Sequence, residues 1–228
     1  MSVAFELSRD PHFLAQYYEM RERCFRKELG IPHFDGSEDD RDRQGFILLA
    51  LQGDRCLGGV RIATSLDMDG DIGELDLPPD GCCMWERLVI DPSVRDRTLQ
   101  LRRDFCHRLI GASRRCGYQH ALVLSSLRNA RFYRQCHSAM GVDFRIHRQL
   151  TNCARGPFAN IEHCLSVADL QDKAPVSMTA AVLPASLSSE EIGGRDIGAQ
   201  VSHCSIPQNA TMRDLPPPYP AYRITLST

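Results

Sequence analysis

The sequence predicts an α/β protein, with a mixed β-sheet covered by helices and an irregular proline-rich tail after it. Along residues 1–172, apolar positions alternate every second residue in some segments and recur every third or fourth in others, as strands and amphipathic helices require. Hydrophobic residues make up 43% of the 228 residues and charged residues 25%, enough to build a buried core. Residues 173–228 hold seven of the 13 prolines and neither Phe nor Trp. We therefore expect one domain at 1–172 and a mostly irregular tail at 173–228.

The N-terminal part of the domain is expected to form a strand, a long helix and three further strands. Residues 3–7 alternate as a strand does, and Asp10-Pro11 supplies a helix N-cap and a proline at the first helical position. The helix is expected over 11–29, ending at Gly30. The apolar runs that follow predict strands at 46–51, 56–63 and 84–90, with a turn at Gly53-Asp54 and a stop at Asp91-Pro92.

The C-terminal part of the domain alternates helices with strands. Apolar residues from Leu101 to Ala112 recur at helical spacing, so we expect a helix over 98–116 that stops at Gly117. Further elements are expected as a strand at 120–126, a helix capped by Asn129 and ending at Gly141, a strand at 142–146 and one more at 161–167. The order is β-α-β-β-β-α-β-α-β with the strand at 161–167 added, which is typical of a mixed sheet with helices on its faces.

Composition and charge exclude several function classes. No apolar run approaches the roughly 20 residues of a membrane helix, and the N-terminus lacks a basic region followed by an apolar stretch, so we expect neither a membrane span nor a secretory signal. A net charge of −2 argues against a general nucleic-acid binder. The ten cysteines contain no C-x-x-C pair and form no zinc-ligand pattern with histidine. We therefore expect reduced core thiols, no metal site and a cytoplasmic location.

Two segments carry a family resemblance. The first, RLVIDPSVR at 87–95, is a buried strand that stops at Asp-Pro before a long helix. The second is the helix that contains Phe132-Tyr133 and is followed by Gly141. Together with the order of the elements, these segments resemble the central strand and the late helix of the GNAT acyltransferase superfamily. The resemblance covers roughly residues 46–150 and implies a GNAT-like acyltransferase fold.

Four further features lie in order along residues 21–87. They are an arginine and a phenylalanine with three residues between them (Arg21, Phe25), two aspartates three apart (Asp39, Asp42), a Gly-Gly-x-Arg strand ending at Arg61, and a Trp-Glu pair followed by an arginine (Trp85, Glu86, Arg87). They resemble the acyl-homoserine-lactone synthase branch of the superfamily and the related N-acyl amino acid synthases.

Two details depart from the pattern of that branch. The family usually has two residues between the glutamate and the arginine, whereas Glu86 and Arg87 are adjacent. With Arg87 in register, the glutamate position falls on Met84, which shares one strand face with Glu86 because strand side chains repeat every second residue. The register of the acidic pair against the family pattern also leaves Asp40 as an alternative to one of the two aspartates, Asp39 and Asp42.

The resemblance implies transfer of a fatty acyl group from a thioester to the α-amine of an amino-acid-like acceptor. The acceptor is either a free amino acid, which the departures favour, or S-adenosylmethionine. Glu86 would take the proton of the amine, directly or through water, and Tyr133 would protonate the departing thiolate. The acceptor would be bound by Arg21, Phe25, Asp39, Asp42, Arg61 and Arg87, and the acyl donor by Trp85, Leu88, Val89, Arg95 and Arg97. Backbone N–H groups of residues 87–89 would meet the reacting carbonyl.

The same residues have structural interpretations. Glu86 is also explained by pairing with a neighbouring arginine, Trp85 by core packing and Tyr133 by packing on its helix. Five acids lie within residues 35–42, so the local composition around Asp39 and Asp42 favours a solvated acidic loop.

The donor partner is suggested by a turn and by a charge cluster. Residues 95–100 contain no glycine, whereas acetyl-CoA enzymes of the superfamily cradle the pyrophosphate on a glycine-rich turn at this place. Residues 95–134 hold ten arginines and two aspartates. We therefore expect an acidic acyl carrier protein as donor, with acyl-CoA as the alternative co-substrate and no permanently bound cofactor. The rival functions are a CoA-dependent N-acetyltransferase and a non-catalytic GNAT-like module that binds an acyl ligand.

Overall fold

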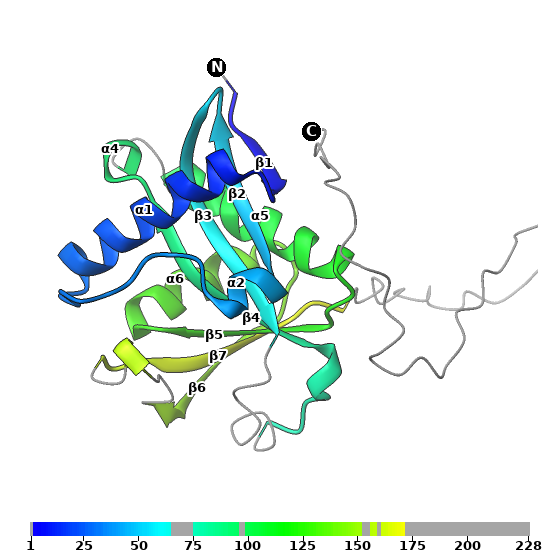
Figure 1. Cartoon of the computed structure of the whole chain (residues 1–228). Coiled ribbons are helices and arrows are strands. Elements are labelled where there is room, and N and C mark those ends of the chain that lie inside the picture. The colour runs from blue at the N-terminus through cyan, green and yellow to red at the C-terminus, as the bar shows by residue number, and fades with distance from the viewer. Residues whose placement is uncertain (1, 65–74, 96–98, 152–155, 159–160, 172–228) are drawn as a thin grey trace, which may run out of the picture. The chain divides into compact units, whose positions relative to one another are not determined.

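The computed structural model describes residues 2–64, 75–95, 99–151, 156–158 and 161–171, which form a layered α/β domain (Figure 1). The strands are β1 (Ala4–Leu7), β2 (Phe46–Gln52), β3 (Arg55–Thr64), β4 (Cys82–Ile90), β5 (His120–Ser125), β6 (Phe144–Thr151) and β7 (Cys164–Asp169). The helices are α1 (Pro11–Glu28), α2 (Asp40–Gln44), α4 (Pro92–Arg95), α5 (Leu99–Arg115) and α6 (Leu127–Ser138), and short 3-10 turns lie at Pro79–Gly81 and Gly156–Phe158. The expected tail at 173–228 lies outside the described residues.

The strands form one mixed sheet, as the sequence predicts, and their order in the sheet is β1-β2-β3-β4-β5-β7-β6. Every neighbouring pair is antiparallel except β4 and β5, which are parallel. β4 pairs with β5 only over Cys82–Met84, although it continues along β3 as far as Ile90. β4 and β5 therefore separate after Met84, and Figure 1 shows β5, β7 and β6 running at an angle to β2–β4.

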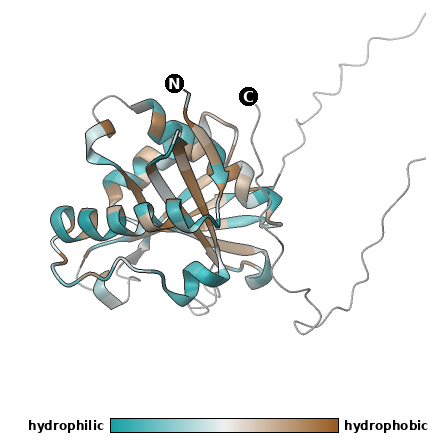
Figure 2. Cartoon of the chain, turned by 45° about the horizontal axis from the view of Figure 1, so that its top comes forward, coloured by the Kyte–Doolittle hydropathy of each residue, from teal (hydrophilic) through white to brown (hydrophobic). Residues whose placement is uncertain are grey.

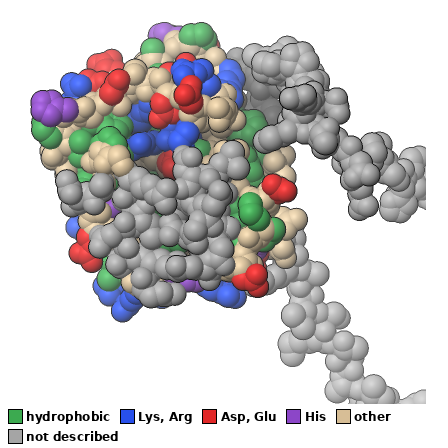
Figure 3. All heavy atoms as spheres, turned by 60° about the horizontal axis from the view of Figure 1, so that its bottom comes forward, with side chains coloured by type: hydrophobic (Ala, Val, Ile, Leu, Met, Phe, Trp, Pro, Cys, Tyr) green, Lys and Arg blue, Asp and Glu red, His purple; other side chains and the backbone are tan. Residues whose placement is uncertain are grey.

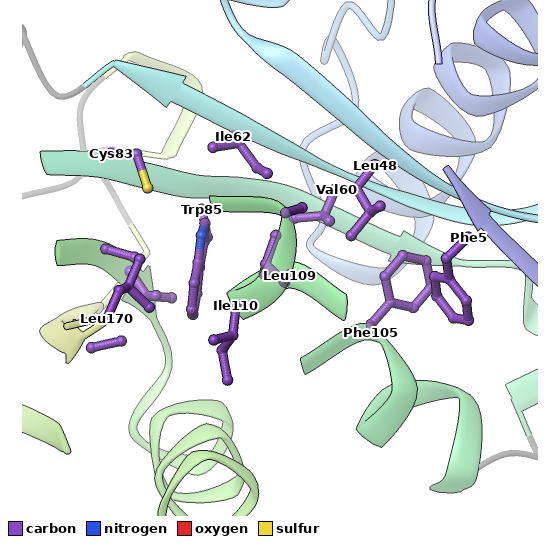
Figure 4. Close-up of a cluster of buried hydrophobic side chains, with 14 of the residues drawn as sticks. Phe5, Leu48, Val60, Ile62, Cys83, Trp85, Phe105, Leu109, Ile110 and Leu170 are labelled. Atoms are coloured by element: carbon purple, nitrogen blue, oxygen red, sulfur yellow. The ribbon is translucent and has the colours of Figure 1, made fainter. Parts of the chain in front are cut away.

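Helices cover both faces of the sheet because the long helices α1 and α5 each present one apolar stripe. The buried residues of α1 recur every third or fourth position from Leu14 to Phe25 and pack on β2 and β3. On the other face, α5 packs Phe105 and Leu109 against the sheet, and Trp85 projects toward this helix from β4 (Figure 4). Figure 2 shows the central strands as mainly hydrophobic and the outer sides of the helices as hydrophilic.

The structure corrects the sequence prediction at several elements, among them the strand expected at 161–167, which runs over Cys164–Asp169. The cap of α6 is Ser126, whose side chain accepts a hydrogen bond from the N–H of Asn129 at 3.4 Å, so the expected cap at Asn129 was wrong by about one turn. The strand expected at 142–146 begins at Phe144 and runs to Thr151. Helix α2 was not expected, because its five residues are all polar and show no apolar stripe.

The cysteines of the described residues are mostly buried. Seven of the eight cysteines in this part of the chain are buried and all eight are free thiols, which matches the expectation of core thiols. Burial raises the pKa of the thiols of Cys83 and Cys106, which keeps them protonated and unreactive. Within the same residues, no helix is both long and apolar enough to cross a bilayer.

Candidate active site

A buried ion-pair network joins α1, α2 and β3. Nη1 and Nη2 of Arg21 donate to the two carboxylate oxygens of Asp42 at 3.0 and 2.9 Å, and the side chains are 1% and 0% exposed. Nη1 of Arg61 donates to Oδ1 of Asp42 at 3.0 Å and to Oδ1 of Asp39 at 2.6 Å. Four of the residues predicted to bind the acceptor therefore lie together, although 40 positions of sequence separate the first from the last.

Glu86 joins the same network from β4. Nε and Nη2 of Arg61 donate to Oε2 of Glu86 at 2.9 and 2.6 Å, and Nη2 of Arg41 donates to Oε1 at 3.0 Å. Nη2 of Arg41 also lies 3.6 Å from Sδ of Met84, so the prediction that Met84 and Glu86 share one face is confirmed. Arg41 was not predicted as a site residue, because only the turn of α2 directs it toward β4.

The expectation of a solvated acidic loop was wrong for Asp42. A capping box closes the first turn of α2: Oδ1 of Asp39 accepts from the N–H of Asp42, and Oδ2 of Asp42 accepts from the N–H of Asp39. This local geometry places Asp42 inside the protein, while the side chain of Asp39 stays 45% exposed. Asp40, the alternative member, is 82% exposed and pairs with Arg43 instead.

The network balances three guanidinium groups against three carboxylates. Burial lowers the pKa of Arg61, but the carboxylates of Glu86, Asp39 and Asp42 outweigh it and raise that pKa. For Asp39, burial by itself would raise the pKa. The hydrogen bond that Asp39 accepts from Arg61 outweighs burial and holds the pKa of Asp39 below its ordinary value. Figure 3 shows acidic and basic side chains intermingled on one face of the molecule.

A β-bulge in β4 separates the two faces of the site. Glu86 pairs with Arg61, and Val89 pairs with Gly59. Between these two pairs β3 has one residue, Val60, whereas β4 has two, Arg87 and Leu88. The first of these, Arg87, has a φ of 57°, and its carbonyl oxygen accepts a hydrogen bond from the hydroxyl of Tyr17 at 3.0 Å. The bulge suspends the usual alternation of side chains, so Glu86 and Arg87 both project toward the face covered by α1 and α2. Their adjacency in the sequence is therefore compatible with a shared site.

Arg87 lies among aromatic rings rather than carboxylates. Its guanidinium carbon lies 5.9 Å from the ring centre of Phe25, 5.1 Å from that of Phe34 and 4.1 Å from that of Phe158. Among the described residues, no ion pair or hydrogen bond engages this guanidinium. Burial, assisted by the nearby charge of Arg61, lowers the pKa of Arg87 to about 10. Within the described part of the chain, Arg87 is therefore a cation of the site that makes no direct ion pair.

On the opposite face of the sheet, an apolar recess lies beside the point where β4 and β5 separate. Trp85 and Leu88 of β4 and Tyr133 of α6 line it together with residues of α5 and the neighbouring strands. Burial raises the pKa of the phenol of Tyr133, so this group remains protonated, as a proton donor to a thiolate must be. Three of the predicted catalytic or donor-binding residues thus share one recess.

Val89, another predicted donor-binding residue, is not part of the lining of this recess. The side chain of Val89 packs in the cluster under α1, because the bulge turns it to that face. Arg97 and the side chain of Arg95 lie outside the described residues.

Comparisons with known proteins find similarity at the level of structure. No family model matches the sequence. No curated protein sequence matches it either. Among solved structures, the CoA-dependent acyl-homoserine lactone synthase BjaI, with SAM and isopentyl-CoA, is similar at a TM-score of 0.56 and 18% identity, over 74% of this chain and 84% of that one.

Two other solved structures are similar over comparable lengths. The acyl-homoserine lactone synthase LasI has a TM-score of 0.53 and 14% identity, over 81% of this chain and 96% of that one. YncA from Salmonella typhimurium, with acetyl-CoA, has a TM-score of 0.53 and 16% identity, over 76% of this chain and 97% of that one. The predicted GNAT-like fold, which these acetyltransferase and lactone-synthase structures share, is thereby confirmed.

Proposed function

We propose that the protein is an N-acyltransferase that moves a fatty acyl group from a thioester to the α-amine of an amino-acid-like acceptor. The observation that carries the proposal is the bulge in β4. Glu86 and Arg87, which forms no direct ion pair with any described residue, lie on one face of the bulge, and an apolar recess lies on the other. An acyl thioester in the recess and an amine beside Glu86 would meet across the open edge of β4. The GNAT fold supports this choice by analogy only.

The acceptor side fits a zwitterionic amino acid. Arg87 supplies a cation for the acceptor carboxylate, and a guanidinium binds a carboxylate through two parallel hydrogen bonds. The half-exposed carboxylate of Asp39 lies in the same network and suits the ammonium group. Once bound, the ammonium group must lose a proton before it attacks, and Glu86 is the carboxylate that we assign to this step.

The acyl donor that we propose is a long-chain acyl carrier protein. The exposed arginines Arg103 of α5 and Arg128, Arg131 and Arg134 of α6 form what we call the arginine surface, and α5 and α6 pack against each other. An acidic carrier protein would be attracted to such a surface. BjaI, by contrast, is CoA-dependent, so acyl-CoA is the competing donor.

The test of the function is incubation of the protein with each donor and with amino acids or S-adenosylmethionine, followed by mass spectrometry of the products. An N-acyl amino acid is the expected product, and a lactone would reassign the acceptor. We expect long-chain acyl carrier protein to react faster than acetyl-CoA at equal concentration. Raising the salt concentration should slow the carrier reaction, because exposed charges are screened beyond roughly 8 Å at physiological ionic strength. Faster reaction with acetyl-CoA would refute the proposed donor, and a salt-independent rate would refute electrostatic docking.

We expect Arg87→Met to raise the KM for the acceptor by about 10- to 100-fold, because the charged hydrogen bond to the carboxylate is lost. Methionine is apolar and flexible enough to remain packed among the phenylalanine rings. Steady-state kinetics with an amino acid and with its amide, which has no carboxylate, separate the effects. The amide should bind equally to both proteins, and an equal loss for both acceptors would contradict carboxylate recognition by Arg87.

A further inference from the structure

Tyr17 lies between helix α1 and the bulge in β4. Its side chain is 0% exposed, and its hydroxyl donates a hydrogen bond to the carbonyl oxygen of Arg87 at 3.0 Å. Burial raises the pKa of the phenol to about 12, so the hydroxyl keeps its proton and can act as the donor. The hydrogen bond joins positions 70 residues apart in the sequence, and the proposed acyl transfer does not yet use it.

The ring of Tyr17 reaches the bulge because β3 has a glycine beneath it. A Cβ atom at Gly59 would lie 2.5 Å from Cδ2 of Tyr17 and 2.7 Å from Cδ2 of Leu49. Carbon atoms pack at roughly 3.5–4.0 Å, so any larger residue at this position would displace the ring. The second glycine of the Gly-Gly-x-Arg strand is therefore explained by the close approach of Tyr17 to the sheet.

The hydrogen bond from Tyr17 fixes the direction of one peptide group in the bulge. The carbonyl of Arg87 and the N–H of Leu88 belong to the same planar trans peptide, so they point in opposite directions. Because Tyr17 holds the carbonyl toward the face covered by α1, the N–H of Leu88 points away from that face. Neither Arg87 nor Leu88 has a residue opposite it in β3, and β5 pairs with β4 only as far as Met84. This peptide group therefore lies outside the regular pairing of both neighbouring strands.

The backbone conformation that gives this direction is one that arginine rarely adopts. Arg87 has a φ of 57°, in the left-handed region where the Cβ atom of any residue other than glycine is crowded. Such a conformation persists only where the surrounding structure imposes it. The rings around Arg87 hold its guanidinium, whereas the hydroxyl of Tyr17 binds the peptide itself.

We propose that Tyr17 is a positioning residue for acyl transfer, because it holds the carbonyl of Arg87 so that the N–H of Leu88 is directed at the carbonyl oxygen of the thioester. This inference rests on the proposed acyltransferase function and adds a residue to it. The thioester oxygen gains negative charge as the amine attacks, and an N–H that is already directed at it stabilises this charge without reorganisation. Tyr17 acts through the peptide rather than on the substrate.

Tyr17→Phe removes the hydroxyl and keeps the ring beside Gly59. We expect kcat to fall by about 10-fold, because the peptide loses the hydrogen bond that directs it. The KM for the acceptor should change by less than about 2-fold, since the guanidinium of Arg87 remains packed among the phenylalanine rings. A lower melting temperature without this selective loss of kcat would assign Tyr17 to folding alone and would overturn the inference.

Tyr18→Phe is the matched control. Tyr18 is the next residue of α1, and its buried hydroxyl has no hydrogen-bond partner among the described residues. The same atom is thus removed from the same helix without breaking a hydrogen bond, and kcat should stay close to that of the wild type. An equal loss of kcat in Tyr17→Phe and Tyr18→Phe would contradict the role of Tyr17.

NMR relaxation of the backbone amide of Leu88 tests the orientation of the peptide without turnover. We expect an order parameter of about 0.85 in the wild type, as in rigid backbone, and a shifted signal with a lower order parameter in Tyr17→Phe. An unchanged Leu88 signal in this variant would overturn the inference. A changed signal, in a protein that transfers no acyl group from any donor, would refute the proposed function and retain the hold of Tyr17 on the peptide. Transfer by the wild type with an unchanged kcat in Tyr17→Phe would do the reverse.

Discussion

Replacing Glu86 with glutamine should lower turnover by about 10²- to 10⁴-fold, because the amide keeps the shape of the side chain but cannot accept the proton of the acceptor amine. Within the described residues, Oε1 of Glu86 accepts one hydrogen bond, from Arg41, and the side chain is 20% exposed. A lone pair therefore remains within reach of an amine or a bridging water. Arg41 and Arg61 hold the carboxylate in position. Steady-state kinetics and thermal unfolding on the same preparation measure the effect.

The matched control for Glu86→Gln is Met84→Leu. Met84 lies on the same face of β4 and also contacts Arg41, but it cannot act as a base. This variant should retain turnover close to that of the wild type. If Glu86→Gln lowers the melting temperature without a selective loss of kcat, Glu86 serves only the ion-pair network, and the general-base role is wrong.

Removal of the carboxylate at the centre of the network should have the largest effect on stability. In Asp42→Ala, Arg21 and Arg61 lose their shared partner at a site that is 0% exposed. Breaking a buried ion pair by removing one partner leaves an uncompensated charge, so we expect the free energy of unfolding to fall by about 3–5 kcal/mol. Urea denaturation followed by a spectroscopic probe measures this change.

The comparison variant for Asp42→Ala is Asp40→Ala in the same short helix. Asp40 is 82% exposed, and we expect its replacement to change the unfolding free energy by no more than about 0.5 kcal/mol. A similar small change for Asp42→Ala would show that the network contributes little to stability. Its residues would then be held together for binding the acceptor rather than for folding.

Periodicity was enough to predict most of the fold. The apolar alternation that predicts strands and the helical spacing in α1 and α5 depend on neighbours along the chain, so they can be recognised without tertiary information. The same holds for Asp10, whose carboxylate accepts from the N–H of His12 at 2.9 Å as an N-cap should. The resemblance to the lactone-synthase branch also grouped Arg21, Asp42 and Arg61 in one expected site, although it did not show that they pair with each other.

Three features of the site depend on contacts between distant segments, and only the tertiary structure reveals them. Arg41 reaches Glu86 because a capping box forms the turn of α2 beside β4. The rings of Phe34 and Phe158 reach Arg87 from loops with no pattern of their own.

The bulge at Arg87 is the third feature. By the alternation rule, Glu86 and Arg87 would lie on opposite faces of β4, and the sequence contains no glycine there to mark a positive φ. The bulge lies where the pairing of β4 with β3 shifts register, and the hydroxyl of Tyr17 donates a hydrogen bond to the carbonyl oxygen of Arg87 at this point. Local sequence thus determined which residues form the strand, and packing between β3, β4 and α1 decided which of them face the same site, because strand register is set by partners that lie far away along the chain.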